Sequence, residues 1–473
     1  MLFTSILYFF FLACTLLLYY IIPTKFRNHL LILASALFYM YAKPAYILII
    51  FFIIITNFFI AIGIERAVKK KAHILYFSLF INLGILIFFK YWNFLIENFF
   101  QFLGLFHINN AVPIIDVVLP LGLSYYIFQT IGYVLDVYRG SLKAEKDIFH
   151  FSLFTLFFPK LLVGPIERAS RFLPQLKQKI FFHRENLIEG SKRIAWGLFK
   201  KLVVADRIAI YQDAVLSSAH DQSGATLFFA TILYTFQVYA DFSGYTDIAL
   251  GTARLFGYDL MENFKRPLFA KSVGDFWRRW HISLSSWVND YIFNPIALNN
   301  RSWGKWAVFF SLIVSFAVIG IWHGPSWNYL VFGLLQAAAL IFETVTKRTR
   351  KSIFNKTNRR VYNVLSILIT FLFVSFSLII FRSASYEEAM GIITGIFANS
   401  GPFFFDKPST LLFMLIGCAI ILMYDLQQEF KIFGDSIVSN DHWAVQQISY
   451  ALLIIYIILA GVFDGGQFIY FSF

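Results

Sequence analysis

Long apolar runs, separated by short loops that carry Lys and Arg, fill this sequence. The first run, from Leu2 to Ile22, has about the length of a full membrane span. Of the 473 residues 59% are hydrophobic and only 14% are charged, whereas about a quarter are charged in a typical soluble domain. These features exclude a soluble globular protein and predict an all-α polytopic membrane protein, because helices satisfy their own backbone hydrogen bonds in lipid.

The net charge of +13 raises the question of nucleic-acid binding. The basic residues do not form one patch, however, and occur in short loops, as the positive-inside rule expects of cytoplasmic loops. We therefore expect contact with membrane lipid and no nucleic-acid partner. The strongest cytoplasmic marker is TKRTRKSIFNKTNRR, with seven basic residues between Lys347 and Arg360. Together with Lys25 and Arg27 in the first loop, it predicts an extracytoplasmic N-terminus.

The turn GIWHGPSWNYLVFG places His323 between two hydrophobic runs, with no Lys or Arg nearby in the sequence. The preceding run, 306–321, would span roughly 24 Å as a helix, against a hydrocarbon core of about 30 Å. We expect Gly320, Gly324 and Pro325 to end one helix and restart another. An ionisable residue at membrane depth indicates function, although a histidine that only hydrogen-bonds the freed backbone groups is the alternative.

A second unusual segment is DFWRRWHISLSSWVNDYIF, whose periodicity predicts one interfacial amphipathic helix. Its tryptophans suit the headgroup boundary, and Arg278 and Arg279 would face lipid phosphates or an anionic cofactor. His281 lies on the apolar side beside Trp280, where a structural and a catalytic role both remain open.

Two further segments interrupt the apolar pattern. Between His150 and Arg193 the run FSLFTLFFPKLLVGP is broken by Pro and Gly, which predicts a re-entrant segment instead of a span. The segment YTFQVYADFSGYTDIALG carries polar side chains that either line a path for a polar substrate or hold helices together. These side chains are Gln237, Asp241, Ser243, Tyr245 and Asp247.

Several motifs in order make the chain resemble the bacterial branch of the membrane-bound O-acyltransferases, especially the alginate and peptidoglycan O-acetyltransferases. They are LPLGLSYYIFQTIGYVLDVYRG, FFPKLLVGPIER, DFSGYTDIALG, MENFKRP, FWRRWHISLSSWVNDYIF, WHGPSWNYLVFG and the closing GGQFIYFSF. The resemblance runs from about Leu2 to Phe473 and implies one integral-membrane domain, with roughly 11–13 membrane helices and re-entrant segments around a central tunnel. Peripheral helices would occupy about 1–147, a catalytic core about 148–345, and C-terminal helices about 346–473.

The resemblance also implies an activity. An acyl group, usually acetyl, would pass from a cytoplasmic thioester such as acetyl-coenzyme A to a polysaccharide outside the bacterial cytoplasmic membrane. His323 would be the essential histidine and His281 its companion, with Arg278 and Arg279 as candidates for the donor's phosphates. The candidate tunnel residues are Trp322, Asp241, Ser243, Tyr245, Asn263 and Trp280. Relatives work with an extracytoplasmic partner, so we expect an SGNH-type O-acetyltransferase or another acetyl-accepting protein.

The chemistry agrees with the residues themselves. A thioester is already activated, so the acceptor hydroxyl needs a base, and an imidazole that titrates near neutrality supplies one. No His or Cys pair has zinc-ligand spacing, so we expect no metal and no permanently bound cofactor. Three alternatives stay open: D-alanyl transfer to teichoic acid from a carrier protein, a transporter or flippase for a lipid-linked saccharide, and a scaffold without activity.

Overall fold

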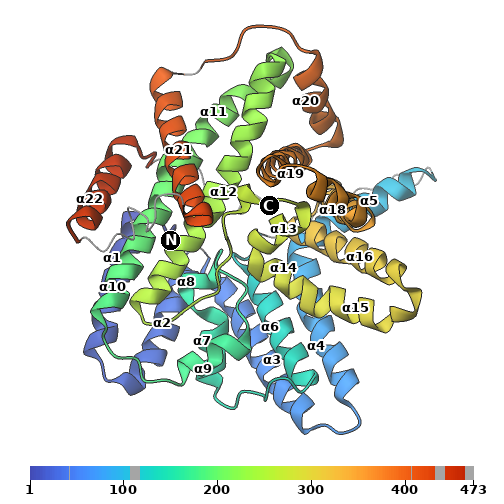
Figure 1. Ribbon diagram of the computed structural model, residues 1–473. Coiled ribbons are helices and arrows are strands. Elements are labelled where there is room, and N and C mark those ends of the chain that lie inside the picture. The colour runs from blue at the N-terminus through green and yellow to red at the C-terminus, as the bar shows by residue number, and fades with distance from the viewer. Residues whose placement is uncertain (42, 107–114, 116–117, 406, 432–442, 464–473) are drawn as a thin grey trace. The chain divides into compact units, whose positions relative to one another are not determined.

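The computed structural model describes residues 1–41, 43–106, 115, 118–405, 407–431 and 443–463 (Figure 1). Within these residues the secondary structure is helical throughout, and no strand is present. The all-α fold expected from the sequence is therefore confirmed. The closing motif GGQFIYFSF lies outside the described residues.

Membrane-length helices are the main feature of the described chain. Six of them are long and apolar enough to cross a membrane, which confirms a multi-spanning membrane protein. They are Pro44–Arg66, Lys71–Gly104, Lys305–His323, Trp327–Val345, Arg359–Arg382 and Pro408–Phe430. The first apolar run forms a shorter helix, Ile6–Ile21, of 16 residues. The total of roughly 11–13 membrane helices stays a prediction.

The chain folds into two compact units. The first consists of Met1–Gly190, Thr252–Met261 and Trp322–Ser326, and the second of Ser191–Gly251, Glu262–Ile321 and Trp327–Phe473. Neither boundary tests the predicted subdivision at residues 147 and 345. The first unit contains α1 (Ile6–Ile21), η1 (Thr24–Phe26), α2 (Arg27–Met40), η2 (Pro44–Tyr46), α3 (Ile47–Arg66), α4 (Lys71–Leu86), the π-turn η3 (Ile87–Tyr91), α5 (Trp92–Gly104), α6 (Leu123–Tyr138), α7 (Ile148–Leu156), α8 (Phe158–Leu161) and α9 (Ala169–Leu176).

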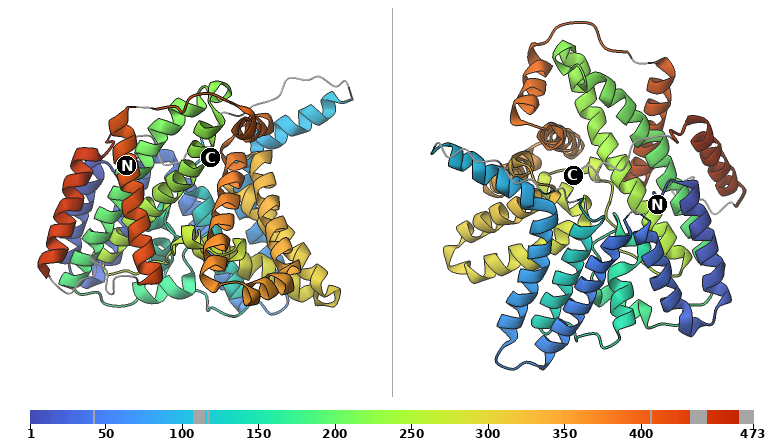
Figure 2. Two further views of the ribbon diagram at one scale, coloured as in Figure 1. Left: turned by 45° about the horizontal axis from the view of Figure 1, so that its top comes forward. Right: turned by 180° about the vertical axis from the view of Figure 1, so that it is seen from behind.

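Helices α3, α4 and α6 of the first unit lie side by side (Figures 1 and 2). A buried polar network joins them: the amides of Asn57 and Asn82 donate to each other's oxygens at 3.1 and 2.9 Å, and Ser78 donates to Asn57 at 2.9 Å. Thr130 of α6 donates to Asn82 at 3.3 Å. Because buried polar groups are costly unless paired, this network fixes the three helices relative to one another.

The segment predicted to be re-entrant contains only short helices, α7, α8 and α9, none of membrane-spanning length. Lys160, at the break, is fully buried and donates to Gln129 Oε1 at 2.7 Å and to the carbonyl of Phe154. Gly122, before α6, has φ +73° and lies so close to Leu161 that a Cβ would stand 2.1 Å from the Leu161 carbonyl oxygen. The motif LPLGLSYY therefore needs glycine for both reasons.

The second unit holds most of the remaining helices, while α10, α12 and α16 contribute residues to both units. These elements are α10 (Arg184–Leu198), the π-turn η4 (Phe199–Ala205), α11 (Asp206–Leu216), η5 (Ala219–Asp221), α12 (Gly224–Leu255), η6 (Pro267–Phe269), α13 (Val273–Arg279), α14 (Ile282–Val288), the π-turn η7 (Asn289–Phe293), α15 (Asn294–Asn299), η8 (Arg301–Trp303), α16 (Lys305–His323), α17 (Trp327–Val345), α18 (Lys347–Lys356), α19 (Arg359–Arg382), α20 (Tyr386–Ala398), α21 (Pro408–Phe430) and α22 (Trp443–Ala460). Figure 2 shows α21 and α22 in red; both pack on η4.

The prediction of one continuous interfacial helix at DFWRRWHISLSSWVNDYIF is wrong. The structure divides it into α13 and α14, because Trp280 is extended and His281 has the left-handed φ of +43°. Its tryptophans do not face a headgroup boundary either, since Trp277, Trp280 and Trp287 are buried within the protein.

The expected role of Gly320 is also wrong. This glycine lies inside α16, which continues to His323, and does not end the helix. A Cβ at Gly320 would stand 2.3 Å from the carbonyl oxygen of Tyr329, so α16 and α17 approach closely at this point. The break itself, over Gly324 and Pro325, is where the sequence placed it.

Candidate active site

His323 is the last residue of α16 and is buried. The chain then leaves the helix through Gly324 and Pro325 and begins α17 at Trp327. The predicted break after His323, between two helices of membrane-spanning length, is confirmed, whereas the depth of His323 within a membrane stays a prediction. The last carbonyls of a helix lack intrahelical donors, so this end of α16 needs donors from elsewhere.

Lys90 supplies these donors. Its Nζ atom donates to the carbonyl oxygen of Trp322 at 2.8 Å and to that of His323 at 3.1 Å. Although the sequence has no Lys or Arg close to His323, folding brings Lys90 to the backbone of this residue. Lys90 lies 233 residues away along the chain, in η3, and sequence reasoning missed it.

Aromatic side chains of α6 enclose Trp322. The rings of Tyr125 and Phe128 lie with their centroids 5.2 and 6.0 Å from the Trp322 ring. The Trp322 ring in turn stands 5.2 Å from the His323 imidazole, close to perpendicular to it. Trp322, a predicted tunnel residue, is buried and packs directly beside the candidate catalytic ring.

His281 belongs to the second unit, where it forms the N-cap of α14. Asn263, another predicted site residue, holds the start of this helix: its carbonyl oxygen accepts from the Ile282 amide at 3.0 Å, and its Oδ1 accepts from the Ser283 amide at 3.1 Å. Asn263 is fully buried, and it gives acceptors to two amide groups of the first helical turn that would otherwise lack them.

An aromatic side chain packs against the His281 imidazole. The ring of Phe242 lies 4.8 Å from it, and His281 is only 1% exposed. Burial lowers the pKa of His281 to about 3, because the charged imidazolium loses its hydration. The side chain is therefore neutral at physiological pH and can act as a hydrogen-bonding group without carrying charge.

The polar residues of α12 form buried ion pairs within the second unit. Lys201 Nζ lies 2.8 Å from Asp241 Oδ1 and 2.7 Å from Asp206 Oδ1. Lys200 Nζ lies 2.7 Å from Asp247 Oδ2, and Arg193 Nε lies 3.1 Å from Asp247 Oδ1. These contacts tie α12 to α10, η4 and α11, as expected of side chains that hold helices together.

The other two predicted tunnel residues of α12, Ser243 and Tyr245, are also buried. Ser243 is 2% and Tyr245 is 1% exposed, and the ammonium of Lys201 stands 5.4 Å from the centre of the Tyr245 ring. Trp280 packs on Phe264 and Phe276. Whether these side chains line a substrate path stays a prediction.

The two arginines proposed for the donor differ in their surroundings. Arg279 Nε lies 3.1 Å from Asp275, and its Nη1 lies 2.9 Å from Glu429. The side chain of Arg278 is 72% exposed and approaches Asp275 only to 3.6 Å. Arg278 therefore has the freer guanidinium of the two.

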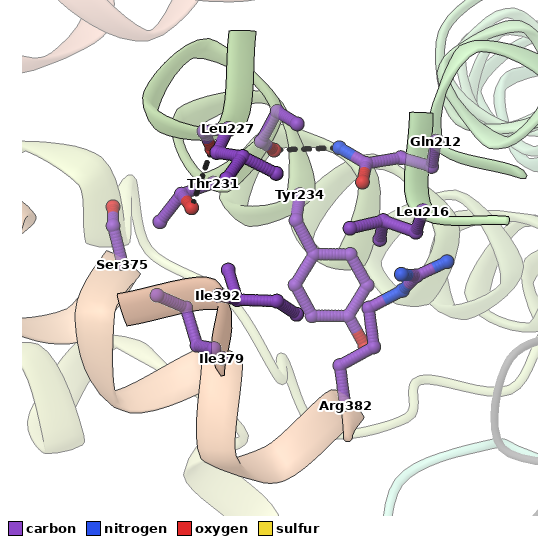
Figure 3. A pocket seen from close by; sticks show the side chains of 10 residues that line it. Gln212, Leu216, Leu227, Thr231, Tyr234, Ser375, Ile379, Arg382 and Ile392 are labelled. Carbon is purple, nitrogen blue, oxygen red and sulfur yellow. Dashed lines mark hydrogen bonds between the residues drawn. The ribbon is translucent and has the colours of Figure 1, made fainter. Parts of the chain in front are cut away.

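A small cavity lies among α11, α12, α19 and α20 (Figure 3). Its walls include Gln212, which donates to the Ala230 carbonyl at 2.6 Å, and Tyr234, whose ring lies 5.3 Å from the Arg382 guanidinium. The cavity volume is about 20 Å³, enough for one water molecule and too small for a thioester. Among the described residues, no group of three or more His, Cys, Asp or Glu side chains could hold a metal ion.

The membrane-length helices define the class: a multi-spanning membrane protein, in which a buried histidine lies at the break between two such helices. The profile of the membrane-bound O-acyltransferase family matches residues 144–385, about half of the chain. The chain belongs to this family and is an O-acyltransferase.

Individual relatives agree with this assignment. The chain is 33% identical over 376 residues to the probable alginate O-acetylase AlgI of Pseudomonas syringae pv. tomato, covering 77% of this chain and 69% of that protein. It is 32% identical over 400 residues to the peptidoglycan O-acetyltransferase of Helicobacter pylori, covering 78% and 74%. A more limited match is the teichoic acid D-alanyltransferase of Bacillus subtilis, 30% identical over 277 residues, covering 57% and 70%.

Proposed function

We propose that this O-acyltransferase takes an acetyl group from a cytoplasmic thioester, acetyl-coenzyme A, and passes it across the bacterial cytoplasmic membrane. The acceptor would be a hydroxyl of an extracytoplasmic polysaccharide, either peptidoglycan or an alginate-like polymer. The names and coverage of the relatives support this choice, since the two O-acetylating relatives match 77% and 78% of the chain and the D-alanylating relative 57%.

The observation that carries the proposal is the placement of His323. Its imidazole is buried at the break between α16 and α17, and Lys90 binds the carbonyl oxygens of the two peptide groups that flank His323. In the proposed step, His323 takes the proton from the acceptor hydroxyl as the oxygen attacks the thioester carbonyl. The carbon–sulfur bond then breaks, and the thiolate leaves and takes up a proton. Exclusion of bulk water limits hydrolysis of the thioester.

His281 has a supporting role in this proposal. As a neutral, buried imidazole it would hydrogen-bond a reactant and would not act as a cation. We therefore expect His281→Ala to lower transfer less than His323→Ala. Arg278 is the proposed contact for the donor's phosphates, because its guanidinium is exposed and paired weakly. Arg279 would assist while remaining bound to Glu429.

The final acceptor requires more than this chain in our proposal. An SGNH-type O-acetyltransferase, or another acetyl-accepting protein outside the membrane, would complete transfer to the glycan. This arrangement requires the thioester to approach from the cytoplasm. It agrees with the orientation predicted from the sequence, in which the basic loop 347–360 is cytoplasmic and the N-terminus is extracytoplasmic.

The test uses purified protein in liposomes with acetyl-coenzyme A labelled in the acetyl group. We expect consumption of the donor with acetyl release to a soluble acceptor, and loss of both in His323→Ala at equal membrane abundance. Activity with a carrier-bound D-alanyl thioester instead would favour D-alanyl transfer to teichoic acid as the function. No donor consumption, together with movement of a lipid-linked saccharide, would favour a transporter, and unchanged glycan acetylation by His323→Ala in cells would favour a scaffold.

A further inference from the structure

Lys90 is a charged residue in the middle of an apolar helix of 34 residues, Lys71–Gly104. A cation in such a segment is costly, so its presence calls for a specific interaction or function. The helix is also irregular at this point, because Lys90 lies in the π-turn η3. Single π-turns within helices often occur at functional sites, since the extra residue changes the direction in which a side chain projects.

The ammonium of Lys90 binds the C-terminal end of α16. It reaches the carbonyl oxygens of Trp322 and His323 at 2.8 and 3.1 Å. These are two of the carbonyls that a helix end leaves without intrahelical donors. A positive charge at a helix C-terminus is also favoured by the helix dipole. One side chain therefore fixes the two peptide groups that flank His323, Trp322–His323 and His323–Gly324.

The position of Lys90 is itself held from outside its own helix. Asn82, two turns earlier, bonds to Asn57 of α3 and accepts from Thr130 of α6. The same α6 carries the rings of Tyr125 and Phe128 that enclose Trp322. A hydrogen-bonded frame therefore connects α4, which leads to Lys90, with α6, which supports the Trp322 ring.

We propose that Lys90 is a positioning residue for acyl transfer, which holds the backbone of Trp322 and His323 so that the imidazole points at the reacting hydroxyl. This inference rests on the proposed role of His323. Lys90 does not have to touch a substrate in this role. Its loss would allow the end of α16 to fray and the imidazole to turn away, and a displacement of about 1 Å at a catalytic group can cost on the order of 10²-fold in rate.

The test compares Lys90→Met with Lys90→Arg, measuring kcat, KM for the acyl donor, and the amount of folded protein in the membrane. We expect Lys90→Met to lower kcat about 10- to 100-fold with KM little changed. Lys90→Arg should retain most of the rate, because a guanidinium can still donate to both carbonyls. The matched control is Lys200→Met, which also removes a buried lysine, one that binds Asp247 within the second unit. We expect it to lower protein amount without lowering kcat.

Each outcome decides the question. Wild-type kcat in Lys90→Met, or a fall in kcat shared equally by Lys200→Met, overturns the positioning role. If Lys90→Met does not accumulate, the kcat of Lys90→Gln, whose uncharged amide nitrogen lies on a shorter side chain, is compared with that of Lys90→Arg. Equal values again overturn the inference. Wild-type transfer by His323→Ala would instead refute the proposed function, whereas an inactive His323→Ala beside a fully active Lys90→Met refutes only the role of Lys90.

Discussion

Two neighbouring lysines of η4 offer a matched test of the buried charges, because they differ in how much their partners depend on them. Lys201 lies between Asp206 and Asp241, whose side chains are only 6% and 2% exposed. Lys200 binds Asp247, but this carboxylate also binds Arg193 at 3.1 Å. Substitution of Lys201 therefore removes an ion partner from two buried carboxylates, whereas substitution of Lys200 leaves Asp247 with a cation.

Removal of one partner from a buried ion pair costs about 3–5 kcal/mol, since the remaining buried charge loses the compensation that this partner gave. We expect Lys201→Met to lower the free energy of unfolding by about this amount. Lys200→Met should cost less, about 1.5–3 kcal/mol, the range of a lost hydrogen bond to a charged group, because Asp247 keeps Arg193 as a partner. The measurement is equilibrium unfolding of the purified protein in mixed detergent micelles.

A charge-removing triple variant is the control. Lys201→Met combined with Asp206→Asn and Asp241→Asn removes all three charges, so it should recover part of the stability lost in Lys201→Met. Equal losses in Lys200→Met and Lys201→Met, or no recovery in the triple variant, would refute the reasoning that these carboxylates depend on Lys201.

Two further predictions concern His281 and the packing of α16. The pKa of His281 falls from 6.5 to about 3 on folding, so the free energy of unfolding decreases as the pH falls from 6.5 toward 3. The free energy of unfolding should therefore decrease less between pH 8 and pH 5 in His281→Gln than in the wild type. Equal decreases would contradict the lowered pKa of His281. Gly320→Ala should reduce the amount of folded protein, because its Cβ would meet the Tyr329 carbonyl oxygen at 2.3 Å, whereas Gly84→Ala, with no atom within 4 Å, should be neutral or stabilising when both are measured by size-exclusion chromatography in detergent.

Much of the site could be predicted from the sequence where the signal is local. A histidine followed by Gly and Pro between two long apolar runs indicates a break in a membrane helix, and the structure places His323 at such a break. The paired carboxylates of α12 also indicated burial, since charges inside an apolar run usually face the protein interior. The sequence left open which cations they bind, because Lys200 and Lys201 lie on a different element.

The errors have physical reasons. The periodicity of DFWRRWHISLSSWVNDYIF is the same whether its apolar face meets lipid or protein, so the burial of Trp277 and Trp287 could not be read from it. The left-handed backbone of His281 gives only a weak local signal, because histidine is enriched in this region but adopts it far less readily than glycine. Lys90 was missed because its contact with the end of α16 exists only after residues more than 230 positions apart come together.

The central claim is that the imidazole of His323 performs the transfer. Single-turnover transfer of labelled acetyl from acetyl-coenzyme A to a soluble hydroxyl acceptor, measured in proteoliposomes with equal amounts of folded wild type and His323→Gln, tests it most directly. Loss of general-base catalysis should slow the chemical step by about 10²–10⁴-fold. A single-turnover rate for His323→Gln within about threefold of the wild-type rate would contradict this claim, because loss of a general base slows the chemical step by far more than threefold.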